Sequence, residues 1–135
     1  MTLEESLMNV AFLNAEKKVA DTMLDIFLDS AFEADQQLVL ATPVRTGRAR
    51  SNWIASLNIP SDEVREPLEV SGALSQNMPT IATAKLGDII YLSNNLPYIG
   101  SLNDGSSAQA PPGFVQKVEA AVKVSVKMRS MTLGV

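Results

Sequence analysis

Mainly apolar side chains recur every three or four residues along the first third of the chain, which is the spacing of one face of an α-helix. Residues 16–41 contain neither glycine nor proline. Pro43 disfavours helical geometry at Thr42, so we expect this helix to end at about Ala41. Its inward face is formed by Val19, Met23, Ile26, Phe27, Ser30, Ala34, Leu38 and Ala41.

A shorter helix is predicted over residues 3–13. Thr2 and Glu5 have the three-residue spacing of a capping box, in which each side chain accepts a hydrogen bond from the other residue's backbone N–H. The sequence leaves open whether this helix continues into the next one.

The middle of the chain carries shorter patterns. Ala49, Trp53 and Leu57 are spaced by four residues, which predicts a helical turn passing into a strand; an extended segment is the alternative. Trp53 is the only tryptophan, and we expect it in the core. Alternating or β-branched residues predict three strands, at residues 68–74, 80–85 and 88–92.

The last third of the chain combines a loop and a helix. Residues 93–113 are rich in Asn, Ser, Gly and Pro, which predicts a long loop. Pro112 suits the first turn of a helix, and apolar spacing continues that helix to about Met128. Residues 129–135 are expected to form a tail that orders only against a partner.

These elements predict one α+β domain over residues 1–135. Its long N-terminal helix and its C-terminal helix are expected to pack on a small antiparallel sheet. The predicted parts are a helical region at 2–41, strands and loops at 42–110, a helix at 111–128 and a tail at 129–135.

The composition narrows the chemistry. The 135 residues include no cysteine and no histidine, so disulfides and thiolate or imidazole metal sites are excluded. No Ser-x-x-Lys spacing occurs either, and we expect neither an enzyme nor a cofactor or metal. A net charge of −4 argues against binding DNA by neutralising phosphates. The acidic start and short apolar runs predict neither an export signal nor a membrane span.

Two clusters of charge stand out. Arg45, Arg48 and Arg50 lie within six positions, and the default interpretation is a solvated basic turn. Carboxylates repeat at four-residue intervals along the long helix, which costs roughly 0.2–0.5 kcal/mol for each adjacent pair. This acidic stripe consists of Asp21, Asp25, Asp29 and Glu33.

Three motifs occur in a fixed order. The first is Thr-Pro-Val-Arg-Thr-Gly-Arg-Ala-Arg-Ser-Asn-Trp at 42–53, the second is Tyr-Leu-Ser-Asn-Asn-Leu-Pro-Tyr at 91–98, and the third is Leu-Asn-Asp-Gly-Ser at 102–106. In this order, after a long helix and before a Pro-started helix, they resemble the neck and tail-completion proteins of tailed bacteriophages, a family similar to the lambda minor tail protein Z group. The resemblance covers nearly the whole chain. It departs at Arg45, where many members carry Asp, and at Asn103-Asp104, where many carry Glu.

The resemblance implies a structural virion protein of the neck, which joins the head connector to the tail and is assembled in the host cytoplasm. It implies a homo-oligomeric ring, most simply a hexamer, that contacts the head connector and the tail-terminator or tail-tube proteins. DNA would pass through the channel without sequence-specific binding, and no membrane is involved. The alternatives are a tail-terminator ring of the same joint and a monomeric protein-binding adaptor.

The motifs supply the expected interface. Its candidate residues are Arg45, Thr46, Gly47, Arg48, Arg50, Asn94, Asn95, Tyr98, Asp104 and Gly105. Thr46 is expected to cap a helix beginning at Gly47, and the two asparagines to bind local backbone amides. We expect the arginines to pair with acidic residues of a neighbouring subunit, and the acidic stripe to face either solvent or the channel. The alternatives are a simple helix stop and restart at 42–53 and a rigid turn at 94–98.

Overall fold

The computed structural model describes residues 2–105 and 112–132. The chain is a mixed helix and sheet protein, as the sequence predicted. Its elements in order are α1 (Leu3–Ala41), α2 (Arg48–Ser51), β1 (Ile54–Leu57), α3 (Val70–Ser75), α4 (Met78–Ala82), β2 (Ile90–Ser93), α5 (Ile99–Asn103) and α6 (Phe114–Thr132).

The two predicted N-terminal helices form one continuous helix, α1. The predicted capping box begins it. The Glu5 backbone N–H donates to Thr2 Oγ1 at 3.2 Å, and the Thr2 backbone N–H donates to Glu5 Oε2 at 2.8 Å. The helix ends at Ala41, because Thr42 is extended before Pro43.

The sheet has two strands. β1 and β2 pair antiparallel, with Ile54 opposite Ser93 and Leu57 opposite Ile90. Asn58 lies just past β1 in the left-handed region, at φ 66°. Its amide oxygen accepts from the Ile89 backbone N–H at 3.0 Å, which closes this end of the sheet.

Two of the three predicted strands are wrong. Residues 70–75 and 78–82 are the short helices α3 and α4. Each buries one apolar side chain completely, Ala73 and Ile81, so a single inward position per turn replaces the alternation that a strand would use. Pro79 stands in the first turn of α4, where its missing N–H costs no hydrogen bond. The third prediction, 88–92, overlaps β2.

The C-terminal third also differs from expectation. The predicted loop at 93–113 contains the short helix α5, and its residues 106–111 lie outside the described residues. α6 continues to Thr132 instead of ending near Met128. Arg129, assigned to the tail, forms an ion pair with Glu33 of α1, which extends the contact between the two helices.

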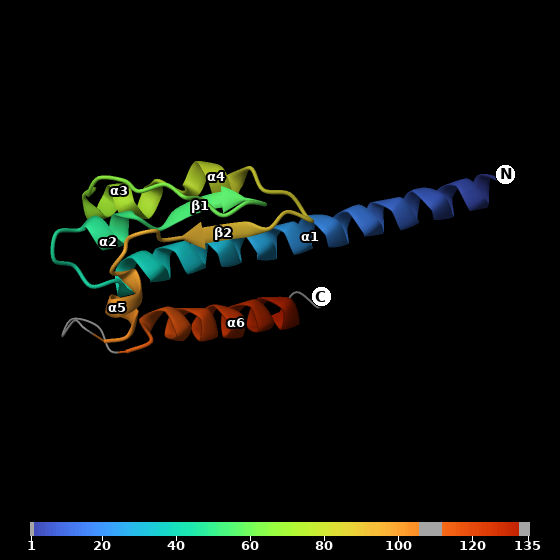
Figure 1. Ribbon diagram of the computed structural model, residues 1–135. Helices are drawn as coiled ribbons and strands as arrows, with labels where there is room; N and C mark the ends of the chain where they lie inside the picture. The colour runs from blue at the N-terminus through green and yellow to red at the C-terminus, as the bar shows by residue number, and fades with distance from the viewer. Residues whose placement is uncertain (1, 106–111, 133–135) are drawn as a thin grey trace.

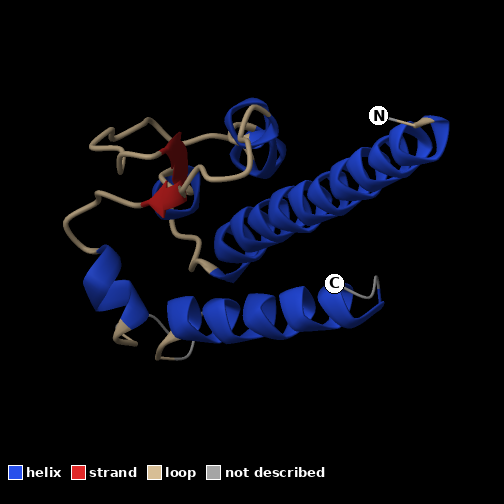
Figure 2. Cartoon of the chain, turned by 90° about the vertical axis from the view of Figure 1, so that its right-hand side faces the viewer, coloured by secondary structure: helices blue, strands red, loops and turns tan. Residues whose placement is uncertain are grey.

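Helix α1 runs through the middle of the molecule (Figure 1). The sheet, α3 and α4 lie on one side of it, and α6 lies along another side (Figure 2). The core gathers where these layers meet, around Leu38, Val39, Trp53, Ala73, Phe114 and Val118. Trp53 is therefore buried in the core, as predicted.

The N-terminal part of α1 extends beyond the rest of the molecule (Figure 1). Every residue from 2 to 19 is exposed, and we call this segment the projection. The other half of the same helix is packed on two sides, so α1 combines a core element with a free arm.

Candidate interaction site

The first motif forms a tight turn between α1 and α2, which we call the arginine turn (residues 43–50). Gly47 occupies the cap position of α2 at φ 80°, a left-handed conformation that favours glycine. The expectation that Thr46 caps a helix beginning at Gly47 is wrong in register, because the helix begins at Arg48. The Thr46 hydroxyl still accepts from the Arg48 backbone N–H, at 3.3 Å.

The arginine turn presents charge that no described residue neutralises. Arg45 is exposed, and Arg48 and Arg50 are half-buried. None of the three forms an ion pair with a described residue. The Nε atoms of Arg48 and Arg50 are buried and find no hydrogen-bond acceptor in residues 2–105 or 112–132. The turn therefore has unused donors.

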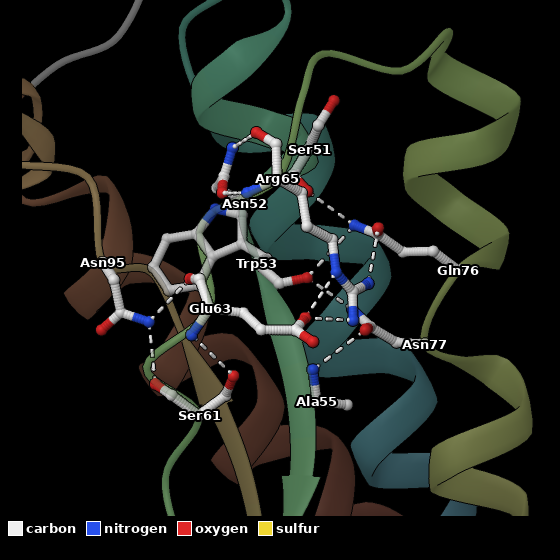
Figure 3. A network of polar contacts seen from close by, with 10 residues as sticks. All are labelled: Ser51, Asn52, Trp53, Ala55, Ser61, Glu63, Arg65, Gln76, Asn77 and Asn95. Carbon is white, nitrogen blue, oxygen red and sulfur yellow. Dashed lines mark hydrogen bonds and ion pairs between the residues drawn. The ribbon is translucent and has the colours of Figure 1, made fainter.

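Two buried side chains hold the arginine turn against the segment at 60–69. The Ser51 hydroxyl donates to the Gly47 carbonyl at 2.6 Å and accepts from the Leu68 backbone N–H at 2.9 Å. The Asn52 amide donates to the Arg65 carbonyl at 2.8 Å and accepts from the Arg65 backbone N–H at 2.7 Å (Figure 3). The turn is thus fixed in place.

The second motif lies next to the first. Asn94 Nδ2 donates to the Ala49 carbonyl at 2.9 Å, and Asn95 Nδ2 donates to the carbonyls of Ser61 at 2.8 Å and Glu63 at 3.0 Å. The expected bond to a local backbone amide is confirmed for Asn94, whose Oδ1 accepts from the Leu96 backbone N–H at 3.3 Å. The bonds from the two Nδ2 atoms go to distant segments, which the sequence did not predict. The asparagines hold distant segments together.

The remaining interface candidates lie around α5. Tyr98 is exposed and caps α5, and Asp104 is exposed at the other end of that helix. Gly105 has φ 96°, and an added Cβ would come within 2.7 Å of Pro112 Cγ, so only glycine fits there. No hydrogen bond or ion pair within the described residues joins these positions to the arginine turn. Figure 1 nevertheless places α5 and α2 at the same end of the molecule, opposite the projection.

The acidic stripe is shorter than predicted. Asp21, Asp25 and Asp29 are exposed, but Glu33 is half-buried between α1 and α6. Its Oε2 lies 2.8 Å from Nη2 of Arg129, and its Oε1 accepts from Ser125 Oγ at 2.9 Å. Glu33 is therefore part of the contact between the helices, and three aspartates form the free acidic face.

Sequence reasoning missed a buried polar network centred on Asn77. Asn77 Nδ2 donates to Asp35 Oδ1 at 2.7 Å and to the Trp53 carbonyl at 2.6 Å. Its Oδ1 accepts from the Ala55 backbone N–H at 2.9 Å (Figure 3). One side chain thereby ties α1 to β1. The signal in the sequence was an acid, Asp35, within three residues of the buried Leu38.

Asp35 is completely buried, and its Oδ2 has no hydrogen-bond partner among the described residues. Burial raises the pKa of Asp35 from 3.8 to about 6, and the hydrogen bond from Asn77 offsets only part of that rise. Asp35 lies inside the fold, so we assign it to stability.

Sequence reasoning also missed the exposure of the projection. Leu3 is 76% exposed, Met8 72% and Phe12 64%. Apolar residues occur on all sides of this segment, a pattern typical of helices that are surrounded by other protein. The large apolar residues of its first four turns are Leu3, Leu7, Met8, Val10, Phe12 and Leu13.

An apolar groove opens near the base of the projection, where α1, α6 and the turn before β2 meet. We call it the α1/α6 groove; its volume is about 360 Å³. Its apolar walls are Met23, Ile26, Phe27, Leu86, Gly87 and Val126. Two serines complete it, but both hydroxyls are used internally: Ser30 donates to the Ile26 carbonyl and Ser130 to the Val126 carbonyl.

The described residues contain no group of three or more acidic side chains placed to hold a metal ion. No helix among them is long and apolar enough to cross a membrane. Searches against protein-family models, curated proteins and solved structures find no match to this chain.

Proposed function

We propose that this chain is a structural subunit of the neck of a tailed bacteriophage, where copies form a ring that joins the head connector to the tail around the DNA channel. The observation that carries the self-assembly is the projection, which leaves its apolar side chains in water. The resemblance of the three ordered motifs to neck and tail-completion proteins supplies the location in the virion.

The exposed apolar surface of the projection gives a large driving force for assembly. Fully burying one Leu, Met or Phe side chain contributes roughly 1.5–3 kcal/mol. Six large apolar side chains on the projection therefore offer on the order of 10 kcal/mol. Ordering and lost translational freedom use up part of this sum. Enough remains to favour a contact with other protein over a free arm.

Two charged surfaces favour contacts between copies. The arginine turn and the aspartates of the acidic stripe lack ion-pair partners among the described residues of their own chain. They have opposite charge and lie on different parts of the molecule, so one can meet the other only in a neighbouring copy. Such a contact joins unlike surfaces, and repetition closes a ring when the rotation between copies closes.

The charge of the chain suits a channel through which DNA must slide. Each copy carries a net charge of −4, so a ring is strongly acidic. Carboxylates on the channel wall repel phosphates and keep DNA from sticking. Asp21, Asp25 and Asp29 are exposed on one side of α1, and facing the channel is the alternative to their pairing with the arginine turn, because the same carboxylates cannot do both.

Negative-stain electron microscopy of the purified chain, with mass photometry over a concentration series, tests the proposal. We expect ring-shaped particles whose population grows with concentration, and density for the same protein in the neck of the virion. Protein that stays monomeric at every concentration and forms one-to-one complexes with another protein would instead identify an adaptor. A ring at the tail end of the joint, without contact to the head connector, would identify a tail terminator.

A further inference from the structure

We infer that the projection of one copy docks in the α1/α6 groove of the next copy. This inference rests on the proposed self-assembly and names the surface that carries it. The chain contains both halves of the contact: an apolar helical arm without a partner, and an apolar groove of about 360 Å³.

The geometry requires the arm to come from another molecule. Met23, Ile26 and Phe27 of the groove belong to the same continuous helix as the projection, so the arm cannot fold back onto them. Residues 3–19 rise about 25 Å along the axis, which is long enough to reach past the body of a neighbour. An arm that fills this groove therefore comes from a second copy of this chain.

The polar atoms at the groove do not oppose an apolar occupant. Ser30 Oγ donates to the Ile26 carbonyl at 2.6 Å, and Ser130 Oγ donates to the Val126 carbonyl at 2.9 Å. Both hydroxyls thus donate their hydrogen bond within their own helix. A side chain such as Leu or Phe displaces water from this groove without leaving those donors unpaired.

Charge complementarity supports the same occupant. The tip of the projection, residues 2–15, includes Glu4 and Glu5 and no basic residue, whereas Glu16, Lys17 and Lys18 at its base bring the net charge of the whole projection to −1. In the sequence, exposed Lys85 adjoins the groove residue Leu86, and exposed Lys127 adjoins the groove residue Val126. Neither lysine forms an ion pair with a described residue.

Asp88, directly after the groove residue Gly87, offsets the charge of Lys85. Hydrogen bonds from the Lys85 backbone N–H and from Asn58 Nδ2, together with the positive charge of Lys85, lower the pKa of Asp88 and keep this carboxylate ionised. Lys127 is therefore the basic side chain that the acidic tip can meet. The aspartates of the acidic stripe lie, on average, roughly 150° around the helix axis from the groove residues of α1, at about 100° per residue. They face away from the docking surface.

Cysteine cross-linking tests the contact cleanly because the chain has no cysteine of its own. Chains carrying Leu7→Cys or Phe12→Cys are mixed with chains carrying Leu86→Cys and oxidised. We expect covalent dimers at a yield at least tenfold above that obtained with Val64→Cys, a position of similar exposure (49%, against 45% for Leu86) in the segment that Asn52 holds next to the arginine turn. Chains carrying Arg45→Cys test docking at the arginine turn instead.

The outcomes separate this inference from the proposed function. Multimers that cross-link arm to arm, or arm to the arginine turn, overturn the docking site and leave self-assembly standing. A chain that forms no multimer overturns both. As a second measurement, Leu86→Glu is expected to weaken self-association at least tenfold with an unchanged melting temperature, whereas Val64→Glu changes neither. Equal association of these two variants also overturns the inference.

Discussion

Asp35 is a carboxyl group that folding removes from water completely. Its folded-state pKa of about 6 lies above the usual 3.8, so the folded chain holds the proton more tightly than the unfolded one. The stabilisation by the protonated form is complete below pH 3.8 and is lost as pH rises through 6. A rise of this size corresponds to roughly 3 kcal/mol.

Asp35→Asn is expected to remove this dependence, because its amide oxygen can still accept from Asn77 and carries no charge. Relative to the variant, the natural chain should lose roughly 2–2.5 kcal/mol of unfolding free energy between pH 4 and pH 7. Urea denaturation of both proteins across this range measures the difference. Parallel pH curves would show that Asp35 stays ionised in the folded state.

Asn77 makes three buried hydrogen bonds that join α1 to β1. Asn77→Ala leaves the Ala55 N–H, the Trp53 carbonyl and an Asp35 oxygen without this partner, and each unsatisfied buried group costs roughly 1–3 kcal/mol. We expect a loss of at least about 2 kcal/mol in chemical denaturation. Asn95→Ala, at an exposed asparagine that also bridges segments, is the control and should cost about 1 kcal/mol or less.

At the scale of elements, the sequence predicted those whose signals are local. The start of α1 follows from Thr2 and Glu5, and its end follows from Pro43, since caps and prolines act within a turn. The two short helices α3 and α4 were predicted as strands. Their conformation depends on what Ala73 and Ile81 pack against, and packing partners are not encoded within a six-residue window.

Every residue of the projection is exposed, so its removal should affect assembly and spare folding. Deleting residues 2–15 is expected to change the unfolding free energy by about 0.5 kcal/mol or less, as surface changes do. The deletion should also abolish self-association. Leu38→Ala, in the packed half of the same helix, is the contrast and should cost about 2–5 kcal/mol. A truncated chain that unfolds like Leu38→Ala would show that the arm belongs to the folding unit.

At the scale of the whole molecule, the candidate site was only partly predictable. The motif residues Ala49 and Asn94 do come together, at 2.9 Å between carbonyl and amide. The exposure of the projection could not be read from its apolar residues, because the same residues would be buried if the body extended further along α1. Glu33, expected as a surface charge, is a half-buried contact because Arg129 of α6 reaches it.

Charge reversal tests how copies meet. Arg45→Glu places a carboxylate opposite the acidic stripe of a neighbour and should weaken self-association several-fold, most strongly at low salt where screening is small. Adding Asp25→Lys to the same chain should restore part of the loss. Lys117→Glu, an exposed site on α6, makes the same change in net charge and should have a smaller effect. If the double variant loses as much self-association as the two single variants lose together, the pairing is excluded.

Because α1 is one unbroken helix of 39 residues, its tip and the layer around Asp35 and Leu38 move as a single rod about 58 Å long. A neighbour that binds the tip therefore sets the orientation of the whole subunit. The angle between α1 and the rest of the subunit then determines the rotation from one copy to the next. Kinking α1 between residues 19 and 23, for example by proline, would alter the curvature of an assembly while both docking surfaces stayed chemically intact.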